Sequence, residues 1–124
     1  MSDSLNRIGK VSSIDYRKGM VSVTYKDRDK STTRTFPFLC PGNEYLMPKV
    51  GDFVLVAHLS NKPSFGVVLG KFFNKDNLPV KYGEGVFRKT LGSNAWIECK
   101  NDEISFHDKN GTVTLKQIIN ALGG

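Results

Sequence analysis

The sequence has little of what most small enzymes and metalloproteins need. Its 124 residues include two cysteines, Cys40 and Cys99, and two histidines, His58 and His107, all far apart in the chain. A zinc site needs about four ligands at short spacings, so we expect no metal, no other cofactor and two reduced thiols. The chain also lacks GxSxG, HExxH and P-loop motifs, and we expect it not to be an enzyme.

Long apolar stretches are missing too. No run approaches ~18 residues, so we expect no membrane-spanning helix. The first residues contain no apolar leader segment, which predicts synthesis in the cytoplasm without export. The 18 Lys and Arg residues exceed the 12 Asp and Glu residues and give a net charge of +6, but the cations are scattered along the chain. Scattered charge is typical of a solvated surface.

What the sequence does contain is β-strand signal. Five runs of β-type residues, separated by polar turns, lie at 7–14, 20–25, 32–39, 50–56 and 65–69. Five short strands in about 70 residues suit a small barrel, and the oligonucleotide/oligosaccharide-binding (OB) type is the natural candidate. From the alternation in these strands, the barrel core is expected to contain Val21, Val23, Val54, Val56, Val67 and Leu69.

The pattern changes after Thr90. Three strands of four or five residues, at 96–99, 103–107 and 112–115, are separated by short polar turns. Three strands with one apolar face cannot form a stable domain alone. That face is expected either to lie against the barrel or to meet two further copies around a common axis. The candidates for such a trimer core are Ile97, Cys99, Ile104, Phe106, Val113, Leu115 and Ile118.

These patterns divide the chain into three parts. Residues 1–74 are expected to form the barrel, 75–89 a linker or collar, and 90–124 a short needle. The end of the needle has two possible structures, because residues 115–122 could continue as a strand or form a helix. Apolar residues at positions i, i+3, i+4 and i+7 of this segment favour the helix.

The order of these motifs resembles one known family. Val50-Gly51-Asp52-Phe53-Val54-Leu55-Val56, followed by Phe65-Gly66-Val67-Val68-Leu69-Gly70 and Asn74, is similar to the OB domain of phage baseplate spikes and the related VgrG proteins of type VI secretion. Arg7-Ile8-Gly9-Lys10-Val11 also resembles the first strand of that domain. The segment from Glu103 to Leu115 resembles the start of the β-helical needle that follows it.

The resemblance implies a homotrimeric spike of a contractile injection system. OB barrels would form its wide end and a β-prism or β-helix its needle, with the baseplate or tail hub protein above and a separate tip protein possible below. It would be assembled into a virion or phage tail-like particle and help to pierce the target envelope. The needle is short and has no His-x-His motif, which some spikes use to hold iron at the tip, so no metal is expected. The link Ser60-Asn61-Lys62-Pro63-Ser64 lacks the acidic residues common in the family.

The main alternative is an OB module that binds single-stranded nucleic acid. Its basic charge would follow the phosphate backbone, and aromatic side chains would stack on the bases. The candidates for this stacking are Tyr16, Tyr25, Phe36 and Phe38. Such modules do not need a strand-turn repeat after the barrel, and for that reason the spike is the first choice.

Overall fold

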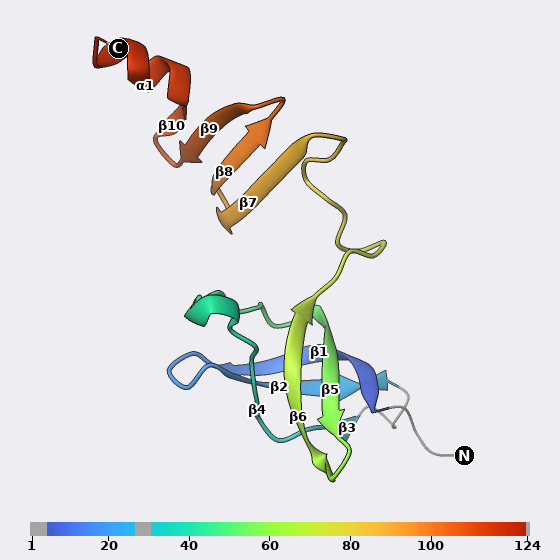
Figure 1. Ribbon diagram of the computed structural model, residues 1–124. Helices are drawn as coiled ribbons and strands as arrows, with labels where there is room; N and C mark the ends of the chain where they lie inside the picture. Colours follow the sequence, from blue (N-terminus) through green and yellow to red (C-terminus); the bar gives the residue numbers. More distant parts are fainter. Residues whose placement is uncertain (1–4, 27–30, 124) are drawn as a thin grey trace. The chain divides into compact units, whose positions relative to one another are not determined.

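The chain folds into two units, each built on its own antiparallel sheet. A computed structural model describes residues 5–26 and 31–123. The units comprise residues 1–77 and 78–124 (Figure 1). Strands make up most of the regular structure, and a short helix lies at the C-terminal end. The predicted all-β class is therefore confirmed at this level.

The sheet of the first unit has six strands in the order β3-β2-β1-β5-β6, with β4 also pairing with β2. Their bounds are β1 Asn6–Asp15, β2 Met20–Tyr25, β3 Ser31–Thr32, β4 Phe36–Pro37, β5 Phe53–Leu59 and β6 Lys62–Lys71. The connection from β4 to β5 contains a 3-10 turn, η2 (Pro41–Asn43). An isolated parallel bridge joins Phe38, just after β4, to Val68 of β6. This bridge links segments from the two ends of the strand order.

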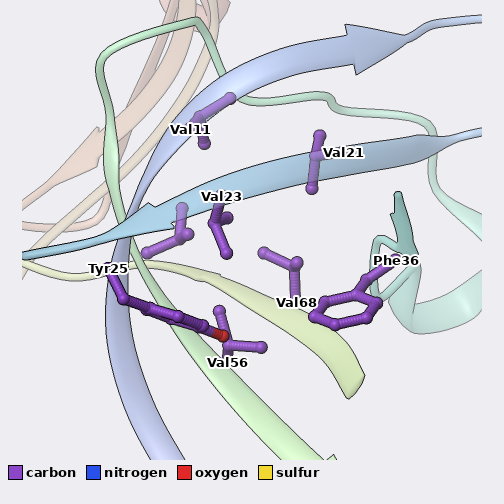
Figure 2. Close-up of a cluster of buried hydrophobic side chains, with 8 residues drawn as sticks. Val11, Val21, Val23, Tyr25, Phe36, Val56 and Val68 are labelled. Atoms are coloured by element: carbon purple, nitrogen blue, oxygen red, sulfur yellow. The ribbon is translucent and has the colours of Figure 1, made fainter. Parts of the chain in front are cut away.

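The core of this unit is made mostly of valines (Figure 2). Alternate positions of β2 and β5 point inward, because successive side chains of a strand face opposite sides of the sheet. Complete burial of one valine contributes about 1.5–3 kcal/mol, so this cluster dominates the stability of the unit. The buried apolar residues are Val11, Val21, Val23, Tyr25, Phe36, Val54, Val56 and Val68.

The inward phase of β6 differs from the sequence-based expectation. Val67 and Leu69 were expected in the core, but Val68 is fully buried while Val67 is half-buried and Leu69 is 39% exposed. β6 is apolar on both phases, so alternation alone does not show which side faces inward. Gly66 sets the phase, because a Cβ there would lie 3.0 Å from the carbonyl oxygen of Ala57 and 3.3 Å from the ring of Phe36.

The expected third strand is split into β3 and β4. Between them Thr33 takes part in the pairing with β2 through both its backbone and its side chain. Its N–H donates to the carbonyl of Val23 at 2.8 Å, and its Oγ1 accepts from the N–H of Val23 at 3.1 Å. Because a side chain replaces one backbone partner, the regular ladder is interrupted at this residue.

The second unit is a four-stranded meander in the order β10-β9-β8-β7, followed by one helix. The bounds are β7 Val86–Gly92, β8 Ala95–Lys100, β9 Glu103–Asp108, β10 Gly111–Thr114 and α1 Leu115–Ala121. β7 was not expected, since residues 86–89 were assigned to the linker. The adjacent cations Arg88 and Lys89 interrupt its apolar alternation, and pairing with β8 decides its structure.

The helix at the end of the chain was the favoured alternative, and it begins at Leu115. Thr114 is its N-cap: its side chain accepts from the N–H of Gln117 at 3.1 Å, while the Gln117 side chain accepts from the N–H of Thr114 at 2.8 Å. This capping box ends β10 and starts α1. Leu115, predicted as the last residue of a strand, is therefore the first residue of the helix.

Gly9 provides a test of the packing in the first unit. A Cβ at this buried position would lie 2.9 Å from Cβ of Val23 and 3.0 Å from the ring of Tyr25. We expect Gly9→Ala to lower the free energy of unfolding by about 1–3 kcal/mol, because both neighbours are themselves buried. Urea denaturation followed by circular dichroism measures the change. Ser12→Ala, at an exposed position of the same strand, should stay within about 0.5 kcal/mol of wild type.

Candidate assembly surface

One face of the second sheet is apolar on β8, β9 and β10, while β7 adds both Phe87 and the cation Lys89, which pairs with Ile97. Ile97 of β8 pairs with Phe106 of β9, which pairs with Val113 of β10, and Cys99 pairs with Ile104 in the next inward row. Residues paired directly across a ladder share a face, as do alternate residues of one strand. The sheet therefore brings together five of the seven expected trimer-core residues. Phe87 of β7 extends the same face, because it pairs with Cys99.

This face has no second layer within its own unit. None of residues 78–123 is buried, whereas the first unit has a contiguous buried core. Phe106 is 37% exposed and Phe87 is 62% exposed. A single sheet in water leaves such side chains hydrated, which forgoes about 25 cal/mol for each Å² of apolar surface left uncovered. The face thus resembles one side of an interface between two protein surfaces.

The other two expected core residues, Leu115 and Ile118, lie on α1 instead of the sheet. With Ile119 and Leu122 they form an apolar stripe at helical spacing, and Leu115 and Ile119 are 40% and 45% exposed. A helix of seven residues is too short to be stable alone. Leu115 and Ile119 line one hollow together with Ile104 and Ser105 of β9, and both keep much of their surface exposed.

The opposite face of the sheet is polar and internally bonded. The guanidinium of Arg88 lies 3.9 Å from the ring centroid of Trp96, and the imidazole of His107 stacks on Trp96 with ring centroids 3.8 Å apart and planes 12° apart. Arg88 also forms an ion pair with Glu98 at 3.4 Å. The imidazole nitrogens of His107 are hydrogen-bonded to Thr112 at 2.6 Å and to Asn94 at 2.9 Å.

This network accounts for the position of Trp96. Trp96 is the second residue of β8, and Arg88 and His107 reach it from the two neighbouring strands. Contacts between side chains on adjacent strands fix the register of a sheet. The Trp96 ring is engaged by these two residues, which argues against a role in stacking on a ligand. The polar face therefore stabilises the sheet.

The remaining candidate residues are His58, Cys40 and Cys99. The carbonyl of Pro63 can only accept, so Nδ1 of His58 donates to it at 2.7 Å, and Nε2 can then accept from the Tyr25 hydroxyl at 2.7 Å. Both cysteines are free thiols. Within residues 5–26 and 31–123, no group of three or more His, Cys, Asp or Glu side chains gathers where it could hold a metal ion. The one helix of this part of the chain is too short to cross a membrane.

Sequence comparisons found no match for this chain. No protein-family model matches the chain, and no curated protein matches it in sequence. The apolar face of the second sheet and the order of the motifs are therefore the features that bear on function.

The Arg88–Trp96 contact provides a test of the polar face. We expect Arg88→Ala to lower the free energy of unfolding by about 1 kcal/mol, because it removes a cation–π contact and the ion pair with Glu98. A double-mutant cycle with Trp96→Phe should give a coupling energy above about 0.5 kcal/mol. Urea denaturation at one fixed protein concentration measures both quantities. Lys109→Ala, in the exposed β9–β10 turn, is the control, and an equal loss there would contradict the assigned role of Arg88.

Proposed function

We propose that this chain is a structural subunit of the spike at the baseplate of a phage or phage-like contractile tail. It assembles as a homotrimer, attaches to the tail hub and helps to pierce the target envelope. The observation that carries the proposal is the amphipathic sheet of residues 86–114, which has an apolar face and no buried residue of its own. The order of motifs, a barrel-type segment followed by strand-turn repeats, supports the same function.

The first sheet supports an OB barrel as the mount of the spike. In an OB fold the first strand pairs with the second and fourth, and the third and fifth strands run parallel where the barrel closes. Here β1 pairs with β2 and β5, and the segment after β4 runs parallel to β6 at the Phe38–Val68 bridge. The N–H of Leu39 also donates to the carbonyl of Val68 at 2.9 Å. This connectivity favours the OB type over an open meander.

The second sheet supports a short needle made from three chains. Three apolar faces turned toward one axis would cover each other, and the polar faces with their Arg88–Trp96–His107 contacts would point to solvent. Closed rotational symmetry satisfies all three faces with one kind of contact. Such a prism would also protect strand edges that a single sheet leaves open. The needle requires no metal, no cofactor and no catalytic residue.

The oligomeric state tests this proposal directly. We expect light scattering at micromolar concentration to give the mass of a trimer for the wild type. Phe106→Asp should give a monomer, because it would place three carboxylates together in an apolar interface. Lys109→Asp introduces the same side chain in an exposed turn of the same unit and should leave the trimer intact. A monomeric wild type, or a trimeric Phe106→Asp variant, would contradict the proposal.

Nucleic-acid binding is the rival function, and most of the aromatic residues expected to serve it are not exposed. Of the four aromatic residues expected to stack on bases, Tyr25 and Phe36 are buried, at 5% and 1% exposure, and Phe38 is half-buried. Tyr16 alone is well exposed, at 59%. Stacking needs an accessible ring face for each base, so this set cannot form a platform. Salt-sensitive micromolar binding to random single-stranded DNA, measured by fluorescence anisotropy, would reverse this conclusion.

A further inference from the structure

The turn that joins β9 to β10 contains an asparagine followed by a glycine. Asn110 is the only asparagine of the sequence with a glycine after it. Both residues are exposed, and Gly111 has a φ of +137°. Apart from its chain neighbours, no heavy atom of the described residues lies within 4 Å of the position that a Cβ on Gly111 would take. The peptide link after Asn110 therefore lacks the side chain that hinders it after every other asparagine.

We propose that Asn110 is a site of spontaneous modification, at which its side-chain amide is converted to a carboxylate. The backbone nitrogen of Gly111 loses its proton to solvent and attacks Cγ of Asn110. The new bond to Cγ closes a succinimide ring, while Nδ2 gains a proton and leaves as ammonia. Water then opens the ring at either carbonyl and gives aspartate or isoaspartate. One water is consumed for each ammonia released, and the inference is independent of the proposed function.

The contacts of the reacting side chain lie within its own turn. The N–H of Asn110 donates to Oδ1 of Asp108 at 2.8 Å, and Nδ2 of Asn110 donates to Oδ2 of the same carboxylate at 3.5 Å. Neither contact involves Cγ, the atom that is attacked. The side chain is therefore held by its own loop and stays beside the main chain from which the attack comes.

The attack requires the turn to open, and the fold makes that opening easy. In the closed turn Gly111 pairs with Asp108, which fixes its main chain in the ladder. However, β10 is an edge strand of four residues, and none of residues 78–123 is buried. Segments with few buried contacts open locally at a low cost in free energy. The hairpin therefore gives the nitrogen of Gly111 repeated access to Cγ of Asn110.

The turn between β8 and β9 provides an internal comparison. Asn101 is also exposed and also lies in a two-residue turn, but Asp102 follows it. The side chain of Asp102 crowds the attacking nitrogen, and its negative charge opposes the loss of the proton from that nitrogen. In addition, β8 and β9 are the two inner strands of the sheet, so this turn opens less readily than the turn at the edge. Asn101 should therefore react more slowly than Asn110.

Modification of Asn110 would disturb the apolar face of the sheet. Isoaspartate has one extra methylene in the main chain, and a two-residue turn cannot absorb it without a change in the register of β9 against β10. Val113 pairs with Phe106 through that register. Both products also place a second carboxylate beside Asp108, and the two like charges repel each other. The modified turn therefore weakens the contribution of β10 to this face.

The experiment follows both asparagines in the full-length wild type during incubation in mildly alkaline buffer. Trypsin, which cuts after lysine, then releases residues 101–109 and 110–116, and each peptide contains one of the two asparagines. Mass spectrometry measures the change from amide to acid in each peptide, and chromatography separates aspartate from isoaspartate. We expect Asn110 to react at least about 10-fold faster than Asn101. Its rate should lie within about 100-fold of its rate in the chain unfolded by guanidinium chloride.

Asn110→Gln is the matched variant, because its longer side chain would have to close a larger ring, and it should leave residues 110–116 unmodified. Equal rates at Asn101 and Asn110 in the wild type would overturn the role assigned to Gly111. A native rate at Asn110 more than about 100-fold below that of the unfolded chain would overturn the site itself. Neither readout depends on the oligomeric state, so a monomeric wild type would contradict the spike proposal and leave this inference standing.

Discussion

An antiparallel sheet that is only one layer thick leaves its apolar face in water, and this constraint governs the second unit. The second unit places Ile97, Phe106 and Val113 in one row and provides nothing within the unit to cover them. Its polar face, by contrast, is bonded from strand to strand. A sheet whose polar face is fully bonded and whose apolar face is uncovered is typical of a subunit that assembles with others. The order of the motifs favours a trimeric spike as that assembly.

The first unit meets the same constraint in a different way. Its sheet curls so that Val21, Val54 and Val68 pack together, and its core is complete within one chain. It therefore has a complete core of its own and could serve as the mount of the proposed spike. The first unit thus has a buried core of its own, whereas the second has none and would depend on its neighbours in the proposed trimer.

Much of the fold follows from the sequence, and the differences have physical causes. Val21, Val23, Val54 and Val56 were expected in the core because their strands alternate, and all four are buried. β6 is apolar on both phases, so its inward side depends on the close approach at Gly66, which no local pattern reveals. β7 contains two adjacent cations, and one of them, Arg88, contacts Glu98 and Trp96, which follow it in the chain by ten and eight residues. The face shared by Ile97, Cys99, Ile104, Phe106 and Val113 was predictable. Its members on one strand are two residues apart, and the strands that carry them are joined by short turns.

The order of strands has a consequence for how the protein would form. In the second unit each strand pairs with the next along the chain, so its hairpins close short loops and can appear quickly. In the first unit β1 pairs with β5 and the segment after β4 meets β6, which requires long loops to close and favours slower folding. Fast hairpins without a covering layer would open again until other copies arrive. Completion of the proposed needle should therefore be a step whose rate depends on the concentration of chains.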